Sequence, residues 1–307
     1  MAKHIDKLLE KIADVAQNRT PVRPSRQYQG KGKVCPAAAY ENVESDRRPR
    51  TADVAIITAM RDPEGEKVKN AFSGNWVPES REGVVFQVAE CEIKGEEAII
   101  VLASQGDIGM VPATILAMKT LQSWQPSLLA MTGICAGVRG KVNIGDIIVG
   151  RQVFDYGVGK IAGGKFVPDY TPIALNERLF NLVEDFASRK TVIGTIRERW
   201  PTATGRPDTI LKVHIGAMGS GAAVIADDDV LKKIEKHKRS LIAIDMEAYG
   251  IARAVAAAVG ERTKFLIVKG VQDFADQFKS DKFREYAAFV SAEFLRSFLE
   301  HVGVGGL

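Results

Sequence analysis

Short, almost wholly apolar runs alternate with amphipathic runs from residue 53 to the C-terminal region of this chain. Runs such as residues 53–59 (DVAIITA) and 265–271 (FLIVKGV) have too few polar positions for strands with one face in water. Strands that are buried on both faces need helices on both sides of their sheet. The pattern therefore predicts an α/β fold in which a mixed, mostly parallel twisted sheet is flanked by helices.

The strand-like runs cover residues 53–59, 84–93, 97–103, 127–132, 146–154, 212–218, 241–244 and 265–271. The helix-like runs cover residues 64–72, 111–124, 176–188, 228–237, 247–259 and 282–302. Each run is long enough to form the strand or helix that the spacing of its apolar residues predicts.

The first fifty residues do not share this alternation. Residues 1–18 place apolar side chains at three- and four-residue spacing, which predicts a short amphipathic helix suited to packing or oligomerisation. Residues 19–50 contain prolines and glycines without sustained periodicity, which predicts a linker. We therefore expect an N-terminal helix and linker at 1–50 and one α/β domain at 51–307.

Composition narrows the class of protein. Lys and Arg number 42 against 38 Asp and Glu, and residues 1–50 carry 11 basic and 6 acidic side chains, so the remainder is nearly neutral. A neutral body argues against nucleic-acid binding. No apolar run approaches the roughly 18 residues of a membrane helix. The apolar stretch at the N-terminus is interrupted by charged residues, unlike the apolar core of a signal peptide. We expect a cytoplasmic protein without a membrane partner.

Familiar cofactor motifs are not met. The glycine run at 159–165 has Phe166 where a phosphate-binding loop has Ser or Thr, and residues 216–221 lack dinucleotide spacing. The four histidines show no metal-ligand pairing, and the three cysteines are too far apart for a thiolate zinc site. We expect neither a metal nor a cofactor.

Three acidic residues follow predicted strands: Glu64, Glu247 and Asp273. Ligands of such sheets bind at the carboxyl ends of the strands, beside turns like the glycine-rich one at 133–140. A single acid at a helix start is commonly a cap. Three acids at one sheet edge instead predict general acid/base chemistry.

One segment resembles a known family. The run DMEAYGIARAVAAAVGERTKFLIVKGVQDFAD resembles the E-M-E-A…S-D-x-A-D block of 5′-methylthioadenosine/S-adenosylhomocysteine nucleosidases, which belong to the purine and uridine phosphorylase superfamily. AIITAM, SQGDIGMVPATILAM, MTGICAGVRGKVNIGDIIVG and, loosely, GSGAAVIAD are similar to further family segments. The resemblance covers about residues 53–300. It implies a nucleoside phosphorylase-like fold and at least a homodimer, in which a neighbour's loop closes the 5′ side of the pocket.

The resemblance implies a role for each matched position. Asp273 would protonate N7 of the departing purine, Glu247 would hold the ribose hydroxyls, and Met246 would pack against the sugar. Val224 and Ile225 would contact the base. The acid must have a raised pKa to donate a proton near neutral pH, and an apolar strand end supplies the desolvation that raises it.

The water-activating base has two candidates. Glu64 corresponds to it if one extra residue is allowed at 61–63, and Glu66 is the alternative. Glu64 is preferred because Val68 and Phe72 then continue the apolar face at four-residue steps. Gly133 and Ile134 belong to the matched glycine loop and are expected to line the substrate site.

The phosphate site separates hydrolases from phosphorylases in this superfamily. Met131 and Ile134 occupy the positions where a phosphorylase of the family has Arg and Ser, so water is the expected nucleophile. Arg61 and Arg139 lie near these turns and keep a phosphate-dependent purine nucleoside phosphorylase as the alternative. A catalytically inactive nucleoside sensor is a second alternative, against which the retained acids argue.

The expected function is therefore hydrolysis of a purine nucleoside or nucleotide to free base, adenine in particular. The 5′ substituent stays open between methylthio, homocysteinyl, hydroxyl and phosphate. Related domains occur as nucleotide-degrading effectors of bacterial defence, which is a further expectation. Five basic residues in the insertion 189–206 either face a phosphorylated substrate such as AMP or ATP or form a solvated loop: Arg189, Lys190, Arg197, Arg199 and Arg206.

Overall fold

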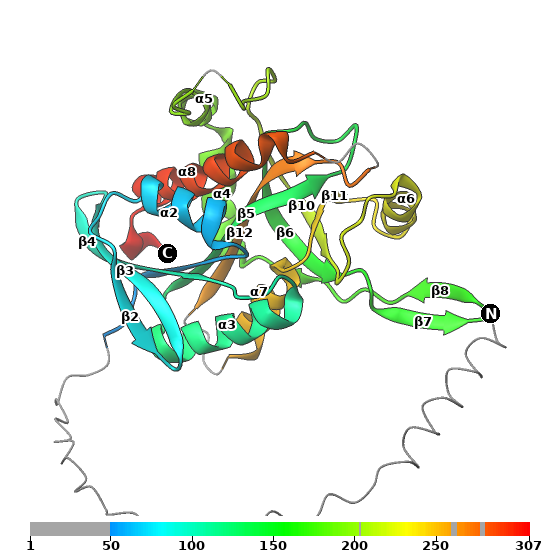
Figure 1. Ribbon diagram of the computed structural model, residues 1–307, viewed down its shortest axis with the longest axis horizontal. Helices are drawn as coiled ribbons and strands as arrows, with labels where there is room; N and C mark the ends of the chain where they lie inside the picture. Colours follow the sequence, from blue (N-terminus) through cyan, green and yellow to red (C-terminus); the bar gives the residue numbers. More distant parts are fainter. Residues whose placement is uncertain (1–49, 203, 259–262, 277–279) are drawn as a thin grey trace, which may run out of the picture. The chain divides into compact units, whose positions relative to one another are not determined.

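The computed structural model describes residues 50–307, apart from 203, 259–262 and 277–279. The predicted N-terminal helix and linker lie outside the described residues, so the boundary at residue 50 stays a prediction. Within the described residues, ten strands form one mixed sheet in the order β11-β10-β6-β12-β5-β1-β4-β3-β2, with β9 paired to β6 (Figure 1).

The strands of this sheet are β1 (Val54–Thr58), β2 (Val77–Arg81), β3 (Val84–Ile93), β4 (Glu96–Ser104), β5 (Leu128–Gly137), β6 (Ile147–Asp155), β9 (Ile173–Ala174), β10 (Val213–Ser220), β11 (Leu241–Asp245) and β12 (Lys264–Asp273). The helices are α2 (Glu66–Ala71), α3 (Met110–Trp124), α4 (Glu177–Ser188), α5 (Lys190–Glu198), α6 (Asp228–His237), α7 (Ala248–Ala257) and α8 (Arg284–Val302). None of the described helices is both long and apolar enough to cross a bilayer.

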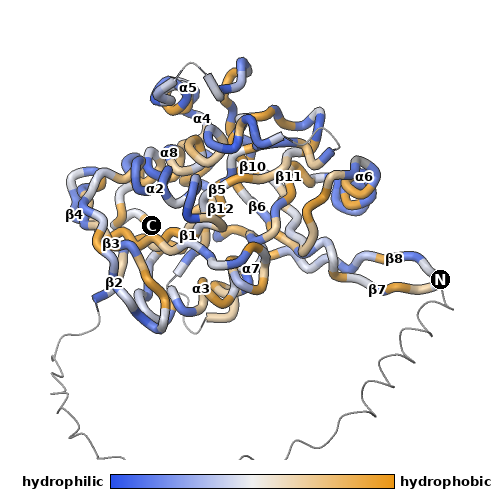
Figure 2. The backbone as a smooth tube through the Cα atoms, viewed as in Figure 1, coloured by the Kyte–Doolittle hydropathy of each residue, from blue (hydrophilic) through white to orange (hydrophobic). Residues whose placement is uncertain are grey.

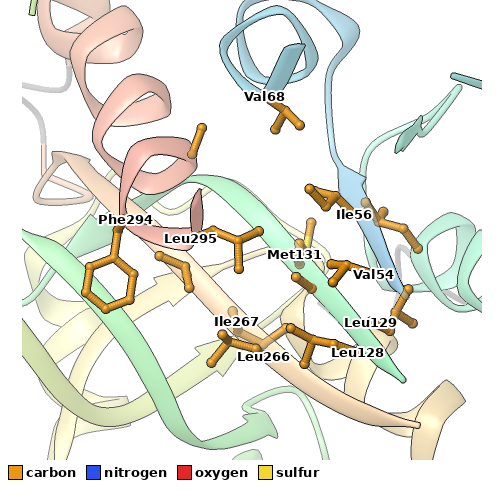
Figure 3. Close-up of a cluster of buried hydrophobic side chains, with 14 of the residues drawn as sticks. Val54, Ile56, Val68, Leu128, Leu129, Met131, Leu266, Ile267, Phe294 and Leu295 are labelled. Carbon is orange, nitrogen blue, oxygen red and sulfur yellow. The ribbon is translucent and has the colours of Figure 1, made fainter. Parts of the chain in front are cut away.

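Helices cover both faces of the central strands, as the apolar runs predict. Helix α8 packs on β12 and β5 beside α2, whereas α3 packs against α7 on the other side (Figure 1). The core between β1, β5, β12 and α8 includes Val54, Leu129, Ile267 and Phe294, which are fully buried (Figure 3). This closely packed layer gives the strand ends fixed positions.

Pairing between β11 and β5 closes part of the sheet on itself. β5 is parallel to β12 but antiparallel to β11, so that Ala136 of β5 pairs with Asp273 on one side and with Ile244 on the other. The carboxyl ends of β5, β11 and β12 therefore meet. Glu64 and Asp273 converge because β1 and β12 are the parallel neighbours of β5, and the closure adds Glu247, which follows β11.

The predicted α/β fold is confirmed, with differences in detail. Strand β5 extends to Gly137 because the glycine-rich segment after the apolar run stays paired with β12. The insertion expected as a loop contains helix α5, whose Ile193 and Ile196 are buried. A short antiparallel hairpin, β7 (Gly159–Ala162) and β8 (Lys165–Pro168), occupies the glycine run and projects from the sheet, with apolar residues along β7 (Figures 1 and 2).

Candidate active site

A cavity of about 200 Å³ opens where β5, β11 and β12 end. Its walls include seven of the eight predicted site residues: Glu64, Ile134, Val224, Ile225, Met246, Glu247 and Asp273. The three acids are at least nine-tenths buried. Glu64 lies more than 180 residues before Glu247 and Asp273 in the sequence. Buried carboxylates need compensating partners, and their partners define the site.

Glu64 is held by backbone amides in the short helical turn η1 (Arg61–Gly65), which leads directly into α2. Its Oε2 accepts hydrogen bonds from Ala59 N (2.8 Å) and Met60 N (3.0 Å), and its Oε1 accepts one from Ile134 N (3.2 Å). Burial raises the pKa of Glu64, and Lys269 with the three amides opposes that rise. The alternative, Glu66, pairs with Lys69 (3.1 Å) and does not line the cavity.

Gly133, the eighth predicted residue, lies directly behind Glu64. A Cβ at this position would stand 2.5 Å from Glu64 Oε1, and the backbone has φ +145°. Only glycine accommodates both the close approach and this conformation. Gly133 N also donates to Ser291 Oγ (3.0 Å) of α8, which fixes the turn. Gly133 therefore serves the site by making room for a carboxylate.

Glu247 stands at the start of α7, yet its side chain does not cap the helix. Asp245 does so instead, accepting from Ala248 N (3.0 Å), and Ser220 Oγ accepts from Tyr249 N (3.0 Å). Ser220 Oγ in turn donates to Asp245 Oδ1 (2.7 Å). The helix start is thereby satisfied without Glu247, whose carboxylate faces the cavity.

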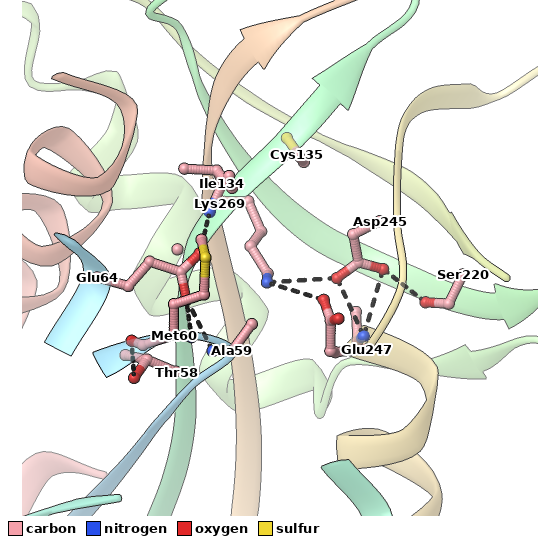
Figure 4. Close-up of polar contacts among 12 residues, drawn as sticks. Thr58, Ala59, Met60, Glu64, Ile134, Cys135, Ser220, Asp245, Glu247 and Lys269 are labelled. Carbon is pink, nitrogen blue, oxygen red and sulfur yellow. Dashed lines mark hydrogen bonds and ion pairs between the residues drawn. The ribbon is translucent and has the colours of Figure 1, made fainter. Parts of the chain in front are cut away.

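Lys269 lies at the centre of the acids and is fully buried (Figure 4). Its Nζ is 3.4 Å from Asp245 Oδ2 and 3.8 Å from Glu247 Oε2. Burial acts to lower the pKa of Lys269, but Asp245, Glu247 and Glu64 outweigh it and raise that pKa. The buried acids thus favour the charged form of Lys269.

Burial raises the pKa of Glu247 to about 7, with Lys269 opposing and Asp245 and Glu64 adding to the rise. Glu247 Oε1 accepts a hydrogen bond from Gly109 N (3.1 Å), so the loop before α3 also fixes it. This carboxyl group consequently changes charge near neutral pH.

Asp273 ends β12, lines the cavity and is 8% exposed. Its Oδ1 accepts from Ala275 N (2.9 Å), and its Oδ2 lies 3.4 Å from the amide nitrogen of Gln272. These contacts orient the carboxyl group toward the space that Glu64 and Glu247 also line.

An aromatic ring enters the cavity from a segment that no motif indicated. Tyr156, just after β6, lines the cavity and donates from its hydroxyl to Ala223 O (3.3 Å). A Cβ at Gly221 would stand 2.0 Å from the Tyr156 ring, so the glycine permits this position. Val224 is 60% exposed at the cavity wall, and Tyr156 supplies the aromatic surface that position 224 lacks.

Arg284, at the start of α8, is the only cationic side chain among the described residues lining the cavity. It pairs with Asp281 (2.9 Å), which also accepts from Gln272 (2.9 Å). Arg139 lies outside, paired with Asp276 and stacked 4.4 Å from the Phe274 ring centroid. Arg61 is exposed and lies outside the lining too.

None of the five basic residues of the insertion 189–206 lines this cavity. Arg189 pairs with Asp185 (2.9 Å) and Arg199 with Glu293 (2.9 Å). Of the two alternatives for these residues, contact with a substrate in this cavity is therefore not found, since α5 lies near the start of β10 and the cavity lies beyond its end. The described residues also contain no cluster of His, Cys, Asp or Glu arranged for a metal ion.

Sequence reasoning overlooked four residues of the site: Asp245, Lys269, Tyr156 and Arg284. One signal for Lys269 was visible, because a lysine in the middle of an apolar strand is almost never buried without acidic partners. Asp245, two residues before Glu247, was its nearest candidate. Tyr156 and Arg284 carry no such signal.

The chain is similar to known proteins over most of its length. The family model described as "Phosphorylase superfamily" matches residues 53–300. The chain is 26% identical over 212 residues to ATP nucleosidase Cap17 of Escherichia coli, a match covering 66% of this chain and 41% of Cap17. The chain spans about half the length of such curated relatives.

Two further matches cover nearly all of the other protein. The chain is 24% identical over 229 residues to the 5′-methylthioadenosine/S-adenosylhomocysteine nucleosidase of Bacillus subtilis, covering 70% of this chain and 88% of that enzyme. The structure of futalosine hydrolase of Helicobacter pylori superposes with a TM-score of 0.65 at 19% identity, covering 82% of this chain and 98% of the other. The last likeness shows a shared fold.

Proposed function

The chain belongs to the phosphorylase superfamily, and from this premise we propose that it is a purine N-glycosidase that hydrolyses a nucleoside or nucleotide to free base. The observation that carries the proposal is the convergence of three buried carboxyl groups, Glu64, Glu247 and Asp273, on one small cavity. Cleavage of a glycosidic bond passes through a cationic sugar and needs one proton donor and one oriented nucleophile.

Asp273 is proposed as the general acid at the purine. It ends β12 at the wall of the cavity, and the bond from Ala275 N to its Oδ1 holds the carboxyl group in place there. Protonation of N7 makes the purine a neutral leaving group. Tyr156 and Val224 offer the surface against which the base would stack.

Glu64 is proposed to orient the attacking water. Three backbone amides fix its two oxygens, so little reorganisation is needed when the water loses its proton. Glu247 and Met246 are proposed to bind the ribose, where the carboxylate also stabilises the developing positive charge. Lys269 acts through these acids as a positioning residue.

Water is favoured over phosphate as the nucleophile. Met131 is fully buried in the core, Ile134 lines the cavity, and Arg61 and Arg139 lie outside it. A phosphate ion beside Glu64 would therefore meet no arginine at these positions to balance its charge. The phosphorylase alternative predicts the opposite requirement for phosphate, which makes the two readily separable.

A 5′-phosphorylated substrate is favoured by a specific observation, the position of Arg284. Arg284 is the one cationic side chain in the described lining of the cavity. Part of this side chain is exposed, so an incoming anion can reach it. The match to an ATP nucleosidase supports the same substrate class. The defence role implied by the resemblance is proposed on this basis as well.

One assay tests the proposal. Purified protein is incubated with adenosine, inosine, methylthioadenosine, AMP and ATP, with and without phosphate, and products are resolved by chromatography. We expect free base and a free sugar or sugar phosphate, unchanged by added phosphate. Ribose 1-phosphate formed only with phosphate would establish the phosphorylase instead, and binding without turnover would establish the sensor.

Arg284→Gln tests the substrate class separately. We expect kcat/KM for AMP and ATP to fall by about tenfold or more, because a charge-assisted contact is lost, while adenosine turnover changes little. An equal fall for adenosine and AMP would contradict a role for Arg284 at the 5′ phosphate.

A further inference from the structure

A second cavity, of about 640 Å³, lies between α5 and the start of β10 and shares no lining residue with the active-site cavity. Strand β10 runs from one to the other. Val213 and His214 at its beginning line the second cavity, whereas Ser220 at its end bonds to Asp245. The proposed reaction makes no use of this second cavity.

Its lining is strongly cationic. Lys190, Arg197, Lys212 and His214 contribute to the wall, against the single acid Glu198. Within the described part of the chain, neither Lys190 nor Lys212 forms an ion pair. Lys190 and Lys212 therefore present positive charge to the cavity that no described acidic side chain pairs with, and this charge would attract an anion.

Arg197 adds a donor with no acceptor. Its Nη2 donates to Pro207 O (3.2 Å), but its Nε is buried and has no hydrogen-bond partner among the described residues. A buried guanidinium nitrogen without an acceptor is costly, whereas a phosphate oxygen satisfies it well. Pro207 O thus holds one nitrogen of the Arg197 guanidinium, and the Nε–H of the same group has no acceptor among the described residues.

Hydrogen bonds also fix the wall that the start of β10 forms. His214 Nε2 is 2.8 Å from Asp146 Oδ2, and Asp146 Oδ1 accepts from Lys212 N (3.1 Å). Asp146 is buried behind the wall and does not line the cavity. These contacts hold the backbone of Lys212 in place and leave its side chain at the cavity.

Apolar side chains complete the cavity. Ile193 is buried in its wall, whereas Ile210 is 79% exposed at its edge, the largest exposure of any bulky apolar residue described. The volume lies within the range of pockets that take small organic ligands. Cationic and apolar groups together fit a ligand that has a phosphate and an organic body.

We propose that this cavity is a second, non-catalytic binding site for a phosphorylated small organic molecule. Lys190, Arg197 and Lys212 bind the phosphate, and Ile193 and Ile210 contact the organic part. This assignment gives two of the five basic residues of the insertion, Lys190 and Arg197, a phosphorylated ligand at a place other than the active site.

The test is calorimetric titration of full-length protein carrying Asp273→Asn, which prevents turnover, with inorganic pyrophosphate and with AMP. The site variant is Lys190→Gln with Lys212→Gln; both side chains are exposed, so folding should persist. The matched control is Lys233→Gln with Lys236→Gln, two exposed lysines on α6 that line neither cavity. Arg284→Gln reports binding at the active site.

We expect the site variant to bind pyrophosphate about tenfold more weakly or worse, while the control binds it like the parent protein and Arg284→Gln keeps the binding event that the site variant loses. AMP should lose one of two binding events in the site variant. Unchanged pyrophosphate binding in the site variant, loss confined to Arg284→Gln, or no binding of either probe up to about 10 mM would overturn the proposal.

Discussion

The three candidate catalytic acids differ in what holds them, and these differences assign them separate tests. Glu64 is bound by amides, Glu247 by one amide and a lysine, and Asp273 by the turn that follows β12. A carboxyl group that only capped a helix would tolerate its amide, because Asn caps nearly as well as Asp.

Asp273→Asn should therefore reduce turnover by about 10²–10⁴-fold with little change in substrate affinity, because an amide is a far poorer proton source. Kinetics of base release together with direct binding measurements check this. Asp169→Asn, on an exposed position, is the control and should behave like the parent. Near-parental turnover of folded Asp273→Asn protein would end the proposed mechanism.

Glu247 should make stability depend on pH. Its pKa of about 7 in the fold lies above the 4.5 of an ordinary glutamate, so folding favours the protonated form. Its stabilising contribution is full below about pH 4.5 and is lost as the pH rises through about 7. Glu247→Gln removes this titration. Between about pH 5 and pH 8, the free energy of unfolding of the parent should therefore fall by up to about 3 kcal/mol more than that of the variant.

Urea unfolding at both pH values measures the effect. Glu247→Gln should also weaken substrate binding and turnover together, because sugar contacts exist in both the ground and transition states. Parallel stability profiles for parent and variant would show that Glu247 is ionised throughout and would contradict its raised pKa.

At the scale of elements, the approach of β5 to the turn η1 decides where Glu64 stands. Gly133→Ala would place a methyl group 2.5 Å from Glu64 Oε1 at a strained φ of +145°. We expect an activity loss of at least about 10²-fold, because displaced catalytic groups lose their geometry. Steady-state assays on folded protein measure it.

Gly140→Ala is the matched control for that change. Gly140 also has a positive φ, +84°, but a Cβ there meets nothing within 4 Å. It therefore reports backbone strain without displacement of Glu64, and its activity should stay close to the parental value. Equal losses in both variants would show that strain alone, not the contact with Glu64, accounts for the effect.

At the scale of the whole molecule, the exposed hairpin favours self-association. Ile161 on β7 is 78% exposed, and Phe166 and Val167 on β8 are 46% and 54% exposed, which is an unusual apolar surface for an isolated hairpin. Together with the resemblance, this predicts at least a homodimer. Light scattering at micromolar concentration should give a mass of at least twice 33.4 kDa. A mass near 33.4 kDa would contradict it.

The amino-acid sequence by itself determined the order and kind of most elements, because apolar period is a local property. Residues 84–93 and 228–237 match β3 and α6 at both ends. The motif around Glu247 and Asp273 also located two of the acids. Short or exposed elements, such as β2 and the β7–β8 hairpin, were missed because their patterns are weak.

Only the tertiary structure decided how the site is assembled. That Glu64 rather than Glu66 faces the cavity, that Ser220 holds Asp245 at the start of α7, and that Lys269 lies among the acids all depend on long-range contacts. The pairing of β5 with β1, β12 and β11 brings these segments together. Local sequence period carries no information about such closure, since the partners of each strand lie far along the chain.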